Sequence, residues 1–376
     1  MTEPHSLDSA ELARPQLTII VPVFNSAQYL PDLLHSFEQQ TNKYFRVIFV
    51  DDGSTDDSLA LLQDWHRNDE HGLSSLVLHK RNGGQSSARN LGLDKLRETS
   101  LFTPWTLFVD SDDMLKPNAI ETLLESAVKY GVDDLLYSAE SSFDSETLLH
   151  QHPDYQTLYN RSVQTNGHVI RGIEMLSMLL DYDQFVASPC LQLFSTSFLL
   201  NTGIRFQEGI IHEDNLFTAL CLLHARRVFY LDKKLYVRRV REDSTMTSPL
   251  SWKNVDGYFN CALSLLDKAD KYEDEALPLI NKLANSWLDS AAGIVDNLSA
   301  EEHKRLLEYP PSKRLFFTLT VQERCSFRKQ LNDVQSSNAD LRQMLHTIET
   351  STSFRVGRVI TFLPGRIKRM LVKPLE

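Results

Sequence analysis

The fold class is decided by two stretches of sequence, LTIIVPVFN at residues 17–25 and VIFVDDGSTDDS at residues 47–58. Each begins with a short, continuous apolar run and ends in polar and small residues, which is typical of a strand buried on both faces. A helical pattern follows each stretch, with apolar residues three and four positions apart. Strands that alternate with helices predict an α/β fold, a mostly parallel sheet covered by helices on both faces.

Two later apolar runs, Leu76–Leu78 and Trp105–Val109, extend this alternation by two more predicted strands. In sheets of this kind, ligands collect at the carboxyl ends of the strands. The polar segments that follow the strands are therefore the first candidates for a binding site. Three such segments should face one crevice: Asp51-Asp52, Asn82–Gly84 and Asp110–Asp113.

Composition excludes several classes of function. With 39 Lys and Arg against 50 Asp and Glu, the formal charge of −11 argues against a general nucleic-acid binder. The four cysteines are far apart, which excludes a zinc ribbon and disfavours a disulfide framework. The first sixteen residues lack the pattern of an export signal, and no apolar run reaches the ~18–20 residues that span a bilayer. We therefore expect a cytoplasmic protein.

The segment Asp110-Ser-Asp-Asp113 places three carboxyl groups after an apolar strand. Their mutual repulsion is unfavourable unless a cation or a helix N-terminus offsets it. A site made only of oxygen atoms suits Mg²⁺ or Mn²⁺, which take one or two carboxylates plus waters and phosphates. The alternative is a solvated acidic turn that caps a helix starting near Lys116-Pro117.

The other two segments also combine a strand end with polar side chains. A carboxylate of Asp51 or Asp52 can accept hydrogen bonds from a base N–H or from ribose hydroxyls, and Ser54 or Thr55 can cap the next helix. The stretch NGGQSSARN at residues 82–90 puts small residues where the backbone approaches a ligand, and an arginine on the first helical turns. Plain strand–turn–helix junctions are the alternatives.

Together with Pro22-Val-Phe-Asn25, these segments resemble, in the same order, the nucleotide-sugar domain of inverting family 2 glycosyltransferases with the GT-A fold. The resemblance covers residues 17–124. It implies that Pro22–Phe24 and Asp52 contact the nucleoside base, with Arg89 beside them. It further implies that Asp110 approaches the ribose and diphosphate of the donor, and that Asp112 holds Mn²⁺ or Mg²⁺. The full set expected to bind the nucleotide sugar is Pro22, Val23, Phe24, Asn25, Asp51, Asp52, Asn82, Gly83, Gly84, Arg89, Asp110, Ser111, Arg239 and Arg241, with Asp112 and Asp110 as metal ligands.

The segment RFQEGIIHEDN at residues 205–215 resembles the family block in which an Asp before a helix is the general base. An acceptor hydroxyl must lose a proton as it attacks the anomeric carbon, and a nearby carboxylate can take it. Asp214 is the candidate base, with Glu213 as its neighbour or alternate. The alternatives are a Glu-Asp pair that caps a helix at 215–223 and, for His212, a metal ligand in place of a structural histidine.

The segment YVRRVREDSTM at residues 236–246 resembles the closing segment of the family. Arg239 and Arg241 are two positions apart and so should share one face of a strand, where guanidinium groups suit phosphate oxygens. A surface charge run is the alternative. Where many relatives carry a lysine, this chain has Gln192, which puts acceptor contacts on that side in doubt.

These patterns predict five parts: a flexible leader (1–16), a GT-A domain (17–250), a helical domain (251–325), a coiled-coil-like helix (326–350) and a basic amphipathic tail (351–376). Within the GT-A domain, residues 17–140 form the nucleotide-sugar half and residues 170–250 the half with acceptor and base. Apolar residues at coiled-coil spacing over 331–348 predict a helix that either pairs with a second copy in a homodimer or lies on its own domain. The basic amphipathic pattern of the tail predicts that it binds the inner membrane surface or docks on the acidic body of the protein.

We expect an inverting, metal-dependent glycosyltransferase in cell-surface polysaccharide synthesis. Its donor would be a nucleotide sugar, with a UDP-sugar favoured, and its acceptor a hydroxyl of a glycan or lipid-linked glycan. It would work in the cytoplasm, as a soluble protein or on the inner face of the membrane. Two alternatives stay open: a non-catalytic scaffold of a glycan-assembly complex, and a nucleotidyltransferase that activates a sugar phosphate. The second would usually carry a glycine-rich phosphate loop after the first strand, which Pro22–Asn25 is not.

Overall fold

The structure is a computed structural model that describes residues 15–68, 71–163, 165–242, 244–326, 328–330, 335 and 343. The chain divides into two compact units, Met1–Arg305 and Leu306–Glu376. The predicted coiled-coil positions Leu331, Val334, Asn338, Leu341, Leu345 and Ile348 lie outside the described residues, as does the basic tail at 351–376.

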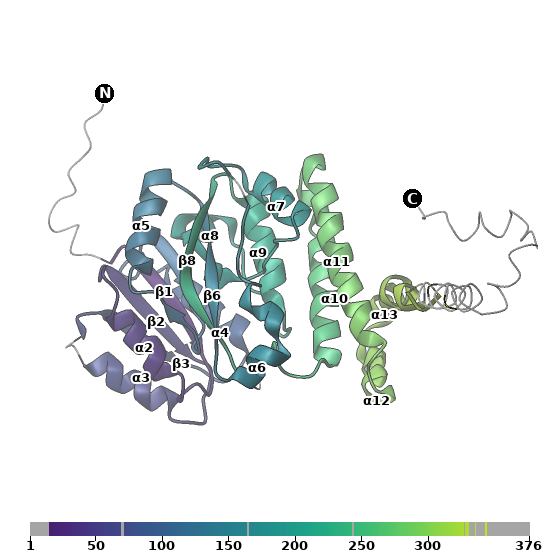
Figure 1. The fold of residues 1–376 in the computed structure, drawn as a ribbon, viewed down its shortest axis with the longest axis horizontal. Helices are drawn as coiled ribbons and strands as arrows, with labels where there is room; N and C mark the ends of the chain where they lie inside the picture. The colour runs from purple at the N-terminus through teal and green to yellow at the C-terminus, as the bar shows by residue number, and fades with distance from the viewer. Residues whose placement is uncertain are drawn as a thin grey trace, which may run out of the picture. The chain divides into compact units, whose positions relative to one another are not determined.

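The first unit is built on an eight-stranded sheet with the strand order β3-β2-β1-β4-β7-β6-β8-β5 (Figure 1). The strands are β1 (Leu17–Val23), β2 (Phe45–Asp51), β3 (Ser74–His79), β4 (Trp105–Phe108), β5 (Met114–Leu115), β6 (Asp134–Phe143), β7 (Gln192–Ser195) and β8 (Val228–Val240). The first four strands pair in parallel. In the other half, β7 is antiparallel to β4 and β6, β5 is antiparallel to β8, and β6 and β8 are parallel.

This architecture confirms the predicted α/β class, with the parallel part confined to β3-β2-β1-β4 and a mixed part beyond it. All seven residues of β1 are buried, as a strand covered on both faces requires. The segment Leu235–Val240 is the end of β8, which lies between β6 and β5 and is therefore not an edge strand.

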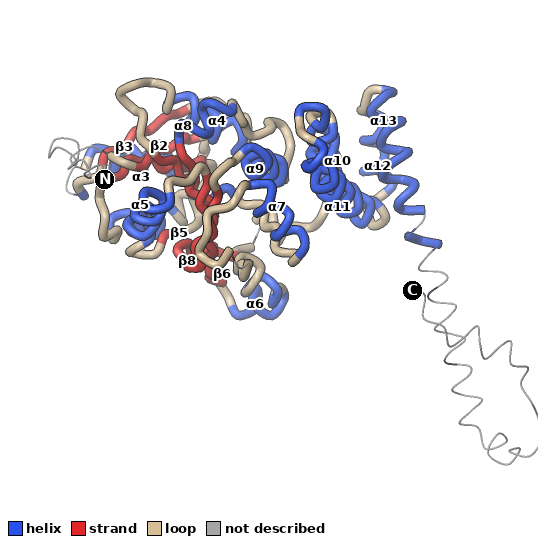
Figure 2. The backbone as a smooth tube through the Cα atoms, turned by 90° about the horizontal axis from the view of Figure 1, so that it is seen from above, coloured by secondary structure: helices blue, strands red, loops and turns tan. Residues whose placement is uncertain are grey.

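Helices cover both faces of the sheet, with α4 on one side and α5 on the other (Figure 2). The helices up to the end of the sheet region are α2 (Leu30–Glu38), α3 (Ser58–Arg67), α4 (Gln85–Lys95), α5 (Ala119–Tyr130), α6 (Glu146–Gln151), α7 (Gly172–Asp181), α8 (Thr196–Thr202) and α9 (Glu213–His224). None of the helices in the described parts of the chain combines the length and the apolar composition needed to cross a bilayer.

The core beneath the carboxyl end of β4 is aromatic. The Phe108 ring meets the rings of Phe194, Phe206 and Phe217 edge to face, at centroid distances of 6.1, 5.2 and 5.8 Å. Phe206 and Phe217 also stack at 3.8 Å. Each such pair adds about 0.5–1.5 kcal/mol beyond the burial of its area. This cluster gives the residues that follow β4 a rigid support.

Two helices follow the sheet, α10 (Trp252–Leu266) and α11 (Leu277–Val295), and the short α12 (Ala300–His303) comes after them. α10 and α11 pack against each other, and α10 also contacts α9. The helical character expected for this region is confirmed. In the second unit, α13 (Pro311–Phe317) leads into one turn of π-helix at Thr318–Gln322.

The start of α3 differs from the prediction. Its N-cap is Asp57, so neither Ser54 nor Thr55 caps this helix. Both residues instead bind Asn25: the Ser54 hydroxyl accepts from the Asn25 N–H at 3.0 Å, and the Thr55 N–H donates to Asn25 Oδ1 at 2.8 Å. The two turns after β1 and β2 are thereby joined to each other, which local sequence could not indicate.

Candidate active site

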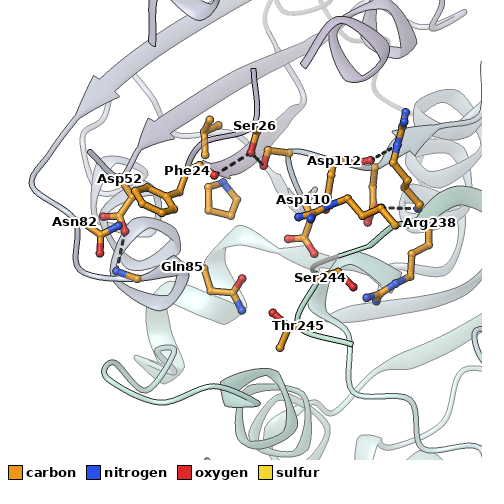
Figure 3. A pocket seen from close by; sticks show the side chains of 17 residues that line it. Phe24, Ser26, Asp52, Asn82, Gln85, Asp110, Asp112, Arg238, Ser244 and Thr245 are labelled. Atoms are coloured by element: carbon orange, nitrogen blue, oxygen red, sulfur yellow. Dashed lines mark hydrogen bonds and ion pairs between the residues drawn. The ribbon is translucent and has the colours of Figure 1, made fainter. Parts of the chain in front are cut away.

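A cavity of about 330 Å³ opens where β1, β2 and β4 end (Figure 3). Its lining comes from five segments of chain: Pro22, Val23, Phe24 and Ser26; Asp52; Asn82, Gly84 and Gln85; Asp110–Asp113; and Arg238, Arg239, Arg241, Ser244 and Thr245. The prediction that three polar segments face one crevice is confirmed for Asp52, Asn82, Gly84 and Asp110–Asp113.

Asp52 anchors the loop that begins α4. Its carboxylate accepts from the backbone N–H groups of Gly83 and Gly84, the latter at 2.7 Å, and from the Lys80 ammonium. Gly84 has φ +86°, a conformation that residues with a Cβ seldom adopt. On the same side of the cavity, the Phe24 ring is 49% exposed.

Three of the predicted nucleotide-sugar residues support the wall without lining it. Asp51 is fully buried and shares a 2.7 Å hydrogen bond with His79 Nδ1. Asn25 is engaged with the turn after β2, and Gly83 with Asp52. Asp51, Asn25 and Gly83 thus hold in place the segments that line the cavity.

Arg89 does not line the cavity either. The resemblance placed it beside the base, but the structure buries it to 2% exposure beneath the acidic turn. Its guanidinium donates to Asp110 Oδ1 at 2.7 Å and to Glu213 Oε1 at 2.8 Å. Burial disfavours the charged form of Asp110, but the ion pair with Arg89 favours it, and the pKa of Asp110 is lowered. For Glu213, with 0% exposure, burial prevails and raises the pKa.

The acidic turn, Asp110–Asp113, is held by hydrogen bonds and ion pairs and is not a solvated turn that caps a helix. Asp113 accepts from the Tyr236 hydroxyl at 2.7 Å and from the Arg239 N–H at 2.8 Å. Burial, and then the charge of Asp112, raises the pKa of Asp113 well above its ordinary value. The N-cap of α5 is Asn118, so the acidic cluster does not cap that helix.

Two arginines of the closing segment are already paired. Arg239 and Arg241 lie over the Tyr29 ring at 5.2 and 4.8 Å, so they share one side as predicted. Arg241 Nε donates to Asp112 Oδ2 at 2.7 Å. Arg239 pairs with Asp32 and Asp144.

The sequence analysis missed Arg238, which lies on the opposite side of the strand. It lines the cavity, and its guanidinium stacks on the Tyr159 ring at 4.6 Å. Among the residues that the structure describes, it has no ion-pair partner within bonding distance. The signal was present: Arg238 is two positions from Tyr236, whose hydroxyl binds the acidic turn, and side chains at that spacing share a face.

The side chains that line this cavity can hold a metal ion only if a bound molecule supplies further coordinating atoms. In the described ranges, no three His, Cys, Asp or Glu side chains form a group that could hold an ion. Asp112 reaches the cavity with one carboxylate oxygen bound to Arg241, and Asp110 with one bound to Arg89. Mg²⁺ usually takes one or two carboxylates and completes its shell with waters and phosphates, so the donor set fits a phosphate-completed site.

Glu213 and Asp214 occupy the first turn of α9, whose N-cap is His212. They therefore do not cap a helix at 215–223, as the alternative had it. Neither lines the cavity, but Arg89 connects Glu213 to Asp110 at its edge. Burial, and then the charge of Glu213, raises the pKa of Asp214 to about 7.

Asn90, on α4, binds the segment at residues 205–215 that leads into α9. Its amide donates to the Phe206 carbonyl at 2.9 Å and accepts from the Phe206 N–H at 3.0 Å. Gln192, by contrast, is fully buried and donates to Asp134 Oδ2 at 2.7 Å, and it does not line the cavity.

The sequence of this chain is similar to those of known proteins. Residues 18–195 match the family described as Glycosyl transferase family 2. Glycosyltransferase GlyA of Streptococcus pneumoniae is 29% identical over 238 residues, 62% of this chain and 32% of that protein. Poly(ribitol-phosphate) beta-N-acetylglucosaminyltransferase TarS of Staphylococcus aureus is 29% identical over 244 residues, 62% of this chain and 37% of that protein. The chain thus spans about a third of the length of these two relatives.

Two solved structures share the fold. S. aureus TarS 1-349 in complex with UDP-GlcNAc has a TM-score of 0.52 at 22% identity, with 84% of this chain and 92% of that chain covered. Mannosyltransferase PcManGT from Pyrobaculum calidifontis, in complex with GDP-Man and Mn²⁺, has a TM-score of 0.52 at 15% identity, with 85% and 88% covered.

We predict that Arg89→Met destabilises the fold by about 3–5 kcal/mol, because it leaves Glu213 and Asp110 without their shared cation. Urea unfolding measures the loss. Adding Glu213→Gln to Arg89→Met should recover part of it, since one of the two stranded carboxylates is then neutral. A loss below about 1 kcal/mol for the single variant would contradict the buried bridge.

Proposed function

We propose that the chain transfers a sugar from a nucleotide donor to a hydroxyl group, because residues 18–195 match the family described as Glycosyl transferase family 2. A UDP-sugar is the favoured donor. The acceptor is a glycan or a lipid-linked glycan, and transfer inverts the anomeric configuration. The names of relatives, among them a teichoic acid poly(glycerol phosphate) polymerase of Staphylococcus epidermidis, support an acceptor that belongs to a cell-surface polymer. We propose that the work is done in the cytoplasm or on the inner membrane face.

One observation carries the proposal: the cavity has an exposed aromatic ring at one end and an arginine without an ion-pair partner among the described residues at the other. Figure 3 shows Phe24 and Asp52 on one side, Arg238 on the other, and Asp110 between, with Ser244 and Thr245 below Asp110. A nucleotide sugar has this layout, because an aromatic base is joined through ribose to a diphosphate. Guanidinium groups suit phosphate oxygens by charge and by geometry.

Asp52 suits the base end. A carboxylate offers about four acceptor positions, and the Lys80 ammonium and the N–H groups of Gly83 and Gly84 already use those of Asp52. These bonds fix the carboxylate and the backbone of the following turn at this end of the cavity. The neighbouring Phe24 ring offers a face on which the base can stack.

Arg238 suits the diphosphate better than the two arginines chosen from the sequence. Arg239 and Arg241 are engaged with carboxylates. Arg238 is surrounded by Tyr159, Asp113 and Asp110, which raise its pKa against the effect of burial, so it stays charged.

A divalent ion, if present, would be held by Asp112 and Asp110 together with the donor phosphates. Bound there, it would act as a Lewis acid that neutralises charge on the departing diphosphate. The protein groups then orient the donor: Asp52 at the base and Arg238 at the diphosphate.

Asp214 is the proposed general base. It would take the proton of the acceptor hydroxyl as that oxygen attacks the anomeric carbon from the side opposite the diphosphate. A general base works best when its pKa lies near the working pH. The raised pKa of Asp214, about 7, meets this condition.

A panel of nucleotide sugars tests the proposal. With Mn²⁺ and no acceptor, we expect slow release of UDP from at least one UDP-sugar, measured by product mass. UDP with Mn²⁺ should also raise the melting temperature of the protein. If no nucleotide sugar is turned over and no nucleoside diphosphate binds, the proposed function is wrong.

We predict that Asp112→Asn abolishes the dependence of donor affinity on Mn²⁺, because the substitution removes one charged ligand while keeping its volume. Calorimetric titration of UDP with and without Mn²⁺ measures this. Asp181→Asn, an exposed carboxylate on α7 that pairs with Lys282, is the matched control and should behave as the parent. Donor affinity that still responds to Mn²⁺ in Asp112→Asn would contradict the metal assignment.

We predict that Asp214→Asn retains donor binding and loses transfer by at least 100-fold, since an amide cannot accept the proton. In the parent protein, kcat/KM should fall about tenfold per pH unit below about pH 7, as the base becomes protonated, and level off above it. Initial rates from pH 5 to 9 measure the profile. Transfer by Asp214→Asn at the parental rate would exclude Asp214 as the base.

A further inference from the structure

His212 begins α9 in an unusual conformation. Its φ of +65° lies in the left-handed region, which non-glycine residues adopt only when their surroundings hold them there. It directly precedes Glu213 and Asp214. The conformation of His212 therefore decides the direction in which the first turn of α9 leaves the chain.

Helix α10 supplies the contacts that hold His212. The Tyr258 ring stacks on the imidazole at 4.1 Å, and the Cys261 thiol donates to the His212 carbonyl at 3.3 Å. At Gly257 the two backbones touch: a Cβ there would lie 2.3 Å from the Ile211 carbonyl oxygen. The side of α10 that carries these three residues thus packs closely against the turn at His212.

Asn254 selects the tautomer of the imidazole. Asn254 Oδ1 accepts from the Ser251 N–H at 2.9 Å, in the capping box of α10, and this turns the amide nitrogen toward His212. Asn254 Nδ2 then donates to His212 Nε2 at 3.2 Å. Nε2 is consequently an acceptor, and the ring is neutral with its proton on Nδ1. Burial lowers the pKa of His212 to about 4, in agreement with a neutral ring.

α10 also faces Asp214. Burial, and then the charge of Asp214, raises the pKa of Tyr258 and of Cys261. The other titratable groups that act on Asp214 come from several elements: Glu213, Arg89, Asp110, Arg238 and Tyr159. The neutral imidazole adds no charge to this set.

We propose that α10 is a positioning element for transfer: by clamping His212 in its left-handed conformation, it holds the Asp214 carboxyl where the acceptor hydroxyl must lose its proton. Tyr258, Gly257 and Asn254 are the positioning residues, and none of them lies within the residues that match the family. This inference rests on the proposed function in one respect, the role of Asp214 as base.

Two substitutions release the clamp in different ways. Gly257→Ala forces the turn away from α10, and Tyr258→Ala removes the stacking surface. For both we expect kcat to fall by about 10- to 100-fold with the donor KM unchanged within twofold, because displacing a reacting group by about 1 Å costs up to that much. Tyr258→Phe keeps the ring and should restore most of the activity lost in Tyr258→Ala. Lys253→Ala, at an exposed position of α10, is the control.

A measurement that needs no turnover separates this inference from the proposed function. In protein labelled with ¹³C at aspartate carboxyl groups, the Asp214 signal is identified by its loss in Asp214→Asn. We expect its titration midpoint in the parent near the raised pKa of about 7, and we expect it to move by at least half a unit in Tyr258→Ala and Gly257→Ala.

Asn254→Asp adds a charge test. Its carboxylate can still accept from Ser251 but must draw a proton onto His212, and the resulting imidazolium should lower the Asp214 midpoint. An unchanged Asp214 titration in all three variants would overturn the positioning role. Unchanged kcat in folded Tyr258→Ala and Gly257→Ala, with Asp214→Asn inactive, would overturn it as well. An active Asp214→Asn would instead remove the proposed base.

Discussion

The site depends on one buried guanidinium. Arg89 binds Asp110, at the carboxyl end of the parallel strands, and Glu213, at the start of α9, with both donor–acceptor distances under 3 Å. Without that charge, two carboxyl groups would face each other in a region of low dielectric constant, where a stranded charge is costly. The bridge therefore holds the two halves of the GT-A region in one arrangement, and the cavity exists because they meet.

Charge balance explains which groups remain for a ligand. Arg239 and Arg241 neutralise carboxylates around the rim, and the Tyr236 hydroxyl and the Arg239 N–H bind the Asp113 carboxylate. Among the described residues at the cavity, Arg238 is the cation that this network leaves without a carboxylate partner. An anion that binds there is met by a preorganised charge and need not break an existing pair.

The residues that match the family end at 195, and three of the features argued above come later in the chain: Asp214, Arg238 and the face of α10. The first half supplies the strand ends that line most of the cavity, where ligands collect in this class of fold. The second half supplies the proposed proton acceptor and the helix that holds it. Binding and proton transfer are thus assigned to different stretches of one folded unit.

The sequence by itself determined the α/β class and the segments at the strand ends, because apolar periodicity and the position of strand ends are local properties. Asp52, Asn82 and Asp110–Asp113 could be placed at one crevice for that reason. Only the tertiary structure decided that Arg89 is a buried bridge, that α9 begins at Glu213, and that Arg238 lines the cavity while Arg239 is paired with carboxylates. Those outcomes depend on partners far apart in sequence, 207 residues in the case of Arg239 and Asp32, and no local pattern encodes such a pairing.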